Sequence, residues 1–153
     1  MQESKYQVAN WKKWKATRNL LASTKNELMN DIKAISYSNE LPGGNHRSVI
    51  EKYNKLIDDL KIYDEYIRAY DVVINRLEDA ITNLLNEEQR IIVLIYANCR
   101  DSKKREEESL KKGISRTDFY RKLAEIFNIL DEVLDSNKIG TNLGLNKPKN
   151  VLL

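Results

Sequence analysis

The feature that most constrains the fold is an unbroken apolar repeat between residues 53 and 84. Its members lie alternately three and four positions apart, which is the heptad pattern of a long helix that packs along its whole length. They are Tyr53, Leu56, Leu60, Tyr63, Ile67, Tyr70, Ile74, Leu77, Ile81 and Leu84. Such a stripe is stable only when covered, so the sequence predicts a long helix with at least one helical partner.

A second long helix is predicted upstream of this repeat. Residues 5–36 contain no proline or glycine, and apolar residues recur there at helical spacing. These are Leu21, Leu28, Ile32 and Ile35. The motif PGG then interrupts the pattern and predicts a loop at residues 41–46, because proline removes a backbone donor and glycine tolerates left-handed geometry.

Two partners are compatible with the heptad helix. Isoleucine at successive a positions with leucine at d positions favours a parallel coiled-coil dimer. The alternative is an antiparallel hairpin with residues 5–36, closed through the PGG loop. Tyr66, Val73 and Ala80 widen the stripe on one side, which favours more than one neighbour. We therefore expect the intramolecular hairpin, and a homodimer in addition.

The composition agrees with an all-α fold and narrows the functional classes. Only 5 Gly and 2 Pro occur among 153 residues, of which 41% are hydrophobic. A single cysteine, Cys99, excludes an internal disulfide, and a single histidine, His46, leaves no His/Cys set for a metal, so we expect no metal or cofactor. No apolar run approaches the roughly 20 residues that span a bilayer, and no secretory signal is visible. We expect a cytoplasmic protein with no membrane partner.

No arrangement of residues indicates catalysis. The acidic residues Asp64, Asp71 and Glu78 fall at e positions beside the heptad seam, where charges are commonly exposed. His46 has no visible Cys, Asp or Ser partner, and Cys99 is typical of a small buried residue. We therefore expect that the protein is not an enzyme.

Residues 86–135 are predicted to form three shorter helices. Asn86 and Gln89 have capping-box spacing, so a helix should begin at residue 87 and carry the sequence QRIIVLIYANC. A short, highly charged helix capped by Asp101 or Ser102 should follow. The third helix should run to about residue 135, with one apolar face. That face comprises Phe119, Leu123, Ile126, Phe127, Leu130, Val133 and Leu134.

The join between the second and third of these helices has the form of a helix-turn-helix. Gly113 can supply the positive φ that ends a helix. Ser115, with Asp118 three positions on, has the spacing of a helix start. A helix stop, a short turn and a helix start within a few residues are what a helix-turn-helix requires.

Positive charge gathers around this turn. Residues 1–40 carry 7 basic and 4 acidic side chains, residues 48–97 carry 6 and 10, and residues 100–125 carry 9 and 6. An acidic middle segment therefore separates two basic ones. A basic turn region is typical of nucleic-acid binding, in which cations neutralise phosphates.

The candidate DNA contacts lie on both sides of the turn. With Phe119 and Leu123 facing inward, helical spacing sends the polar residues at the start of the third helix outward or to the flanks. Arginine can read guanine, threonine can meet a thymine methyl group or a phosphate, and tyrosine and lysine suit the backbone. These candidates are Arg116, Thr117, Tyr120, Arg121 and Lys122. Further phosphate contacts are predicted at Lys103, Lys104, Arg105, Lys111 and Lys112.

Two stretches carry a resemblance to a known family. LLNEEQRIIVLIYANC and GISRTDFYRKLAEIFNIL, separated by a polar helix, resemble region 4 of sigma factors as it recurs in phage transcriptional regulators of the ArpU and RinA type. The resemblance covers residues 10–135. It implies that residues 113–121 begin the recognition helix, that the protein controls phage late or packaging genes, and that RNA polymerase is a second candidate partner.

The sequence departs from the family pattern before the turn. Sigma-like domains usually carry an Ile-Ala pair and then Leu-Gly, where this chain has Glu108, Ser109, Lys112 and Gly113. Leu110 alone then remains to dock that helix on the core. This departure supports an alternative function, a helical protein-interaction module, such as an adaptor or inhibitor, with a degenerate helix-turn-helix.

The prediction is an all-α protein with three parts. Residues 1–85 form a helical hairpin, residues 86–135 form a helix-turn-helix DNA-binding domain, and residues 136–153 form a flexible tail. The expected function is sequence-specific binding of double-stranded DNA by a transcriptional regulator of phage or prophage origin.

Overall fold

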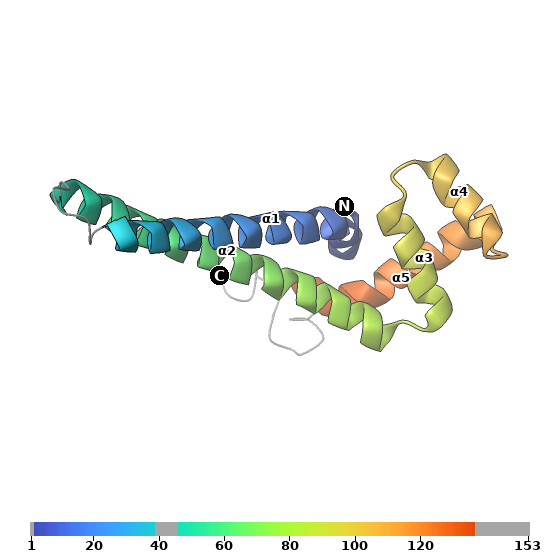
Figure 1. Ribbon diagram of the computed structural model, residues 1–153. Helices are drawn as coiled ribbons and strands as arrows, with labels where there is room; N and C mark the ends of the chain where they lie inside the picture. The colour runs from blue at the N-terminus through green and yellow to red at the C-terminus, as the bar shows by residue number, and fades with distance from the viewer. Residues whose placement is uncertain (1, 39–45, 137–153) are drawn as a thin grey trace, which may run out of the picture. The chain divides into compact units, whose positions relative to one another are not determined.

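The structure is a computed structural model that describes residues 2–38 and 46–136. All the regular elements in these residues are helices: α1 (Glu3–Ser38), α2 (His46–Leu84), α3 (Glu87–Asn98), α4 (Ser102–Lys111) and α5 (Arg116–Leu134) (Figure 1). The predicted all-α class is confirmed. The predicted loop at 41–46 and tail at 136–153 lie outside the described residues, except for His46, which begins α2, and the backbone of Ser136.

The chain forms two compact units. The first comprises Met1–Lys13 and Ile74–Leu153, and the second comprises Trp14–Val73. Helices α1 and α2 therefore each contribute one segment to each unit. Helices α3, α4 and α5 belong wholly to the first unit, where each contacts the other two.

The first unit has one hydrophobic core. Tyr96 of α3 and Phe127 of α5 meet edge to face inside it, with ring centroids 5.2 Å apart. The start of α1 and the end of α2 complete this core, so it extends beyond the three short helices. Its buried residues are Val8, Leu77, Ala80, Ile81, Leu85, Ile92, Val93, Ile95, Tyr96, Ile114, Phe119, Leu123, Ile126, Phe127, Leu130 and Leu134.

A buried carboxylate on α5 caps the start of α1. Asp131 is 2% exposed and accepts hydrogen bonds from the backbone N of Ser4 at 2.9 Å and from Nε2 of Gln2 at 2.8 Å. Ser4 Oγ also donates to the carbonyl of Phe127 at 2.9 Å. A carboxylate at a helix N-terminus satisfies unpaired N–H groups and complements the helix dipole. Helix α1 consequently begins at Glu3, earlier than predicted, and is held against α5.

In the second unit, segments of α1 and α2 run side by side in opposite directions. Arg18 Nε of α1 lies 2.8 Å from Asp71 Oδ1 of α2. Lys25, which comes later on α1, forms an ion pair with Asp64, which comes earlier on α2. The hydrogen bond and charge of Asp71 raise the pKa of Arg18. The two aspartates occupy heptad e positions, so the a and d seam of this segment faces α1.

Burial along the heptad seam differs between the units. In the second unit the seam residues from Tyr53 to Tyr70 are half-buried, whereas Ile74, Leu77 and Ile81 of the first unit are buried. Leu84 was predicted to continue the seam but is 41% exposed. Helix α2 ends there and the chain turns into α3, so its neighbour Leu85 enters the core instead.

Candidate nucleic-acid interface

A Schellman motif ends α4 and makes the turn before α5. The backbone N of Ile114 donates to the carbonyl of Ser109 at 2.9 Å, and the backbone N of Gly113 donates to the carbonyl of Leu110 at 2.9 Å. Gly113 has φ of 77°, the left-handed conformation that this motif requires. The predicted helix stop at Gly113 is confirmed.

Replacing Gly113 with alanine is expected to destabilise the protein by about 1–2 kcal/mol, because an L residue resists positive φ. A Cβ at this position would meet no atom within 4 Å, so the loss reflects backbone strain alone. Chemical denaturation followed by circular dichroism measures it. Gly113→Asn is the matched control and should lose less, since asparagine tolerates the left-handed region. Equal stability of Gly113→Ala and the parent would contradict the turn geometry.

Helix α4 docks through a small residue and through the turn that follows it. Ser109 is 0% exposed, and its Oγ donates to the carbonyl of Glu106 at 2.8 Å. Ile114 is buried in the core. The prediction that Leu110 docks α4 is wrong: Leu110 is 63% exposed, because one position along a helix turns a side chain by about 100°.

Arg105 secures the other side of α4. Its guanidinium lies 4.2 Å from the centre of the Tyr96 ring, and its Nε donates to the carbonyl of Cys99. A cation over an aromatic face is attracted by the ring electrons. Arg105 therefore stabilises the packing of α4 on α3, and its predicted phosphate contact stays a prediction.

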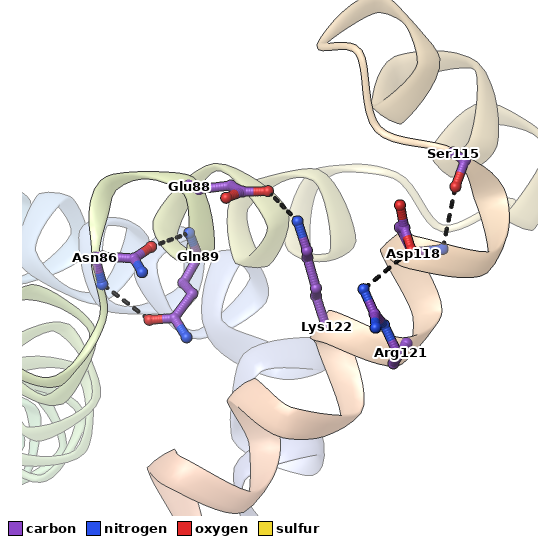
Figure 2. A network of polar contacts seen from close by, with 7 residues as sticks. All are labelled: Asn86, Glu88, Gln89, Ser115, Asp118, Arg121 and Lys122. Carbon is purple, nitrogen blue, oxygen red and sulfur yellow. Dashed lines mark hydrogen bonds and ion pairs between the residues drawn. The ribbon is translucent and has the colours of Figure 1, made fainter.

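Capping side chains fix the starts of α3 and α5 (Figure 2). Asn86 Oδ1 accepts from the backbone N of Gln89 at 2.8 Å, and Gln89 Oε1 accepts from the backbone N of Asn86 at 2.9 Å, so the predicted capping box is confirmed. Ser115 Oγ accepts from the backbone N of Asp118 at 3.3 Å and caps α5. Helix α4 is capped by Asp101, the first of the two residues predicted for that position.

The predicted DNA contacts on α5 lie at its exposed start. Arg116 is 74% exposed, Arg121 is 62% exposed, and Thr117 and Tyr120 are exposed as well. Lys122 is half-buried and reaches from α5 to Glu88 of α3 (Figure 2). The remaining predicted contacts are exposed on α4 and the turn. They are Lys103, Lys104, Lys111 and Lys112.

Carboxylates accompany several of these cations. Arg116 Nε lies 3.1 Å from Glu106 Oε1 of α4, which links the two helices of the turn. On α5, Arg121 Nη2 lies 3.1 Å from Asp118 Oδ1. Lys111 Nζ lies 2.9 Å from Glu108 Oε1, and this hydrogen bond, with the charge of Glu108, raises the pKa of Lys111. Sequence reasoning counted these acids in the net charge but did not pair them with particular cations.

Some of the predicted cations remain free. Within residues 2–38 and 46–136, Lys103, Lys104 and Lys112 form no ion pair. An exposed ammonium without a protein carboxylate can approach a phosphate without first leaving a partner. These three lysines, with the exposed start of α5, form the candidate nucleic-acid interface.

A groove of about 540 Å³ lies between α3 and α4. Its apolar lining residues include Ile91, Ile95 and Leu94, the last of which is 44% exposed. Lys104 and Glu107 are among the polar residues that line it from α4. The mixture of apolar and charged lining residues suits a peptide or helix better than a nucleic acid.

The described residues form neither a metal site nor a membrane-spanning helix. No set of three or more His, Cys, Asp or Glu side chains in residues 2–38 and 46–136 is arranged to hold a metal ion. No helix in the described ranges has both the length and the apolar character required to cross a bilayer. Comparison with protein family models, curated proteins and solved structures gave no match to this chain.

Proposed function

We propose that this chain is a sequence-specific DNA-binding transcriptional regulator, in which a helical hairpin carries a helix-turn-helix similar to region 4 of sigma factors. The observation that supports it best is the tightly capped turn between α4 and α5, followed by an exposed polar helix start. A helix-turn-helix presents the N-terminal residues of its second helix to base edges in the major groove. The phage or prophage origin rests on the sequence resemblance alone.

The candidate contact residues divide into base-reading and phosphate-binding roles. Arg116, in the first turn of α5, is the candidate to read guanine, and Thr117 beside it can meet a thymine methyl group. Arg121 lies five positions from Arg116, about 140° around the helix, so the two arginines cannot share one narrow contact. Arg121 is therefore assigned to the backbone, together with Lys103, Lys104, Lys111, Lys112, Tyr120 and Lys122.

The ion pairs affect how strongly such an interface binds. Arg116 and Arg121 must leave their carboxylate partners before they contact a nucleic acid. Each arginine therefore gains less binding free energy than an unpaired lysine does. Exposed ion pairs of this kind contribute about 0–1 kcal/mol, which DNA contacts can exceed. We expect affinity that depends steeply on salt, with specificity concentrated at Arg116.

The first experiment selects preferred duplexes from a random pool and compares them with scrambled duplexes over a salt series. Preferred duplexes should bind more tightly, and Lys111→Ala with Lys112→Ala should weaken both kinds alike. Each lost phosphate contact should reduce the slope of log affinity against log salt by about 0.9. Equal binding to preferred and scrambled duplexes by the parent would reject sequence-specific recognition.

A matched pair of arginine variants tests the assigned roles. Arg116→Ala should relax base preference at one position by about 1–3 kcal/mol, whereas Arg121→Ala should weaken all duplexes more evenly. Neither should unfold the protein, because both side chains are exposed. Identical effects on every duplex would remove Arg116 from the base-reading role.

A second candidate function is a helical protein-interaction module, an adaptor or inhibitor. It is favoured by the carboxylates paired with Arg116, Arg121, Lys122 and Lys111, and by the groove between α3 and α4. RNA polymerase is the partner that the family resemblance implies. If both arginine variants bind every DNA like the parent but lose a protein partner, this function replaces the regulator.

A further inference from the structure

The groove between α3 and α4 has an apolar side and a cationic side. From α3 it is lined by Ile91, Leu94 and Ile95, which spacings of three and one positions place on one face of the helix. Leu94 is 44% exposed, so part of its apolar surface is open to a partner. The α4 side carries Lys104 near the start of the helix and Lys112 just after its end.

The two lysines are available to a binding partner. Both are exposed and form no ion pair with any residue in the described part of the chain. Two glutamates also line the groove. Glu108 is paired with Lys111, whereas Glu107 is exposed and lies between Lys104 and Lys112 along the chain. The groove therefore offers one cation near each end of α4 and a carboxylate between them.

We propose that the occupant of this groove is an amphipathic helix of a partner protein, with acidic residues at positions i and i+7 and apolar residues at i+3 and i+4. Lys104 and Lys112 lie eight positions apart, about 12 Å along α4, and seven positions of a partner helix span about 10.5 Å. One acid can therefore reach each lysine. The apolar positions lie between the two acids on the same face of the partner helix, where they meet Leu94 and Ile91.

Charge complementarity favours this occupant over a continuous polyanion. A nucleic acid carries a phosphate at every nucleotide, and a phosphate at the centre of the groove would lie against Glu107 and the apolar side chains of α3. A helix with two separated acids avoids both of these unfavourable contacts. It also covers the apolar surface of Leu94, which a phosphate cannot do.

This inference rests on the second candidate function and deepens it by giving the chemistry of the partner. Its tests contain no DNA, so their failure would leave the proposed DNA binding untouched. Arg116 and Arg121, whose variants test the second candidate function, do not line the groove. The two results can therefore be separated.

A pair of synthetic helical peptides tests the charge pattern. Both contain leucine at i+3 and i+4 and two glutamates in a background of alanine and glutamine. The first has its glutamates at i and i+7, and the second has them at i+2 and i+9, on the face opposite the leucines. Fluorescence anisotropy of the labelled peptides measures their affinity for the full chain.

The first peptide should bind saturably and about fivefold more tightly than the second. Each exposed ion pair contributes about a two- to threefold gain in affinity, and the first peptide forms two of them. Absence of saturable binding by the first peptide, or equal affinity for the two peptides, overturns the proposal.

Variants of the chain locate the peptide. Leu94→Gln should weaken binding of the first peptide about tenfold, because it removes apolar contact without adding charge. Leu84→Gln is the matched control: Leu84 is 41% exposed and lies outside the groove, so this variant should bind like the parent. Lys104→Ala should weaken binding about two- to threefold, whereas Lys103→Ala, at the adjacent exposed position outside the groove, should not. Equal binding by Leu94→Gln and Leu84→Gln rejects the proposal.

A second copy of the chain is the competing occupant, and sedimentation equilibrium without peptide tests for it. Any dimer that the parent forms should survive Leu94→Gln, because the groove is left open for a partner helix. A dimer that dissociates in Leu94→Gln but not in Leu84→Gln would assign the groove to a second copy and overturn the proposal.

Discussion

Replacement of Phe119 by alanine should lower the free energy of unfolding by about 3–5 kcal/mol, through loss of apolar burial and the cavity that remains. Phe119 is 0% exposed in the core of the first unit. Its ring also meets Tyr120 edge to face, with centroids 5.2 Å apart. Denaturant unfolding monitored by circular dichroism measures the change. Such a loss is a large fraction of the stability of a typical domain.

Thr117→Ala provides the control for this substitution. Thr117 is exposed two positions earlier on the same helix, and exposed changes of this kind usually alter stability by less than about 0.5 kcal/mol. DNA affinity of Phe119→Ala should fall only in proportion to the folded fraction, whereas that of Arg116→Ala should fall without loss of stability. A Phe119→Ala protein as stable as Thr117→Ala would mean that α5 is packed by a different face.

Helix limits in residues 86–135 were predictable because their determinants are local. The capping pair Asn86 and Gln89, the cap Ser115 and the left-handed Gly113 each act within a few positions of the chain. Residue types at fixed spacing therefore locate these ends without knowledge of the tertiary structure. The apolar face of α5 was also predictable through Leu134, except at Val133, which is 37% exposed near the end of the helix.

Contacts between distant segments were not predictable from the same patterns. Asp131 looks like one more charged residue on an amphipathic helix, yet it is buried because the start of α1 supplies donors from Ser4 and Gln2. The docking residue of α4 was misplaced by one position, from Ser109 to Leu110, since periodicity in a short, charged helix is too weak to fix its rotation.

The candidate nucleic-acid interface likewise combines features that local spacing predicts with contacts that depend on the tertiary structure. Exposure of Thr117 follows from its place about 200° around α5 from Phe119, whereas Arg116 lies on the side of Leu123 and is exposed because it is the first residue of the helix. The ion pair between Arg116 and Glu106 depends instead on the angle between α4 and α5, which no local spacing encodes. A count of charge along the sequence therefore gives the net charge of the turn but not which of its cations are paired.

Ile74 provides the second large effect, because its side chain is 6% exposed on α2. Isoleucine burial contributes about 2 kcal/mol, and a carboxyl group in its place has no designed hydrogen-bond partner. Transfer of such a polar group from water costs about another 1–3 kcal/mol on the scale of protein mutations. The lost burial of isoleucine and the cost of burying a carboxyl group both lower the free energy of unfolding, so the two effects add.

Ile74→Asp should therefore destabilise the protein by about 3–5 kcal/mol, observed as a lower denaturation midpoint and reduced helical signal. Asn75→Asp, at the exposed next position of α2, adds the same side chain and should change stability by less than about 0.5 kcal/mol. Both variants are compared with the parent at one protein concentration, because self-association makes apparent stability depend on concentration. Equal midpoints for the two variants would show that residue 74 faces water and that the heptad seam was assigned to the wrong face of α2.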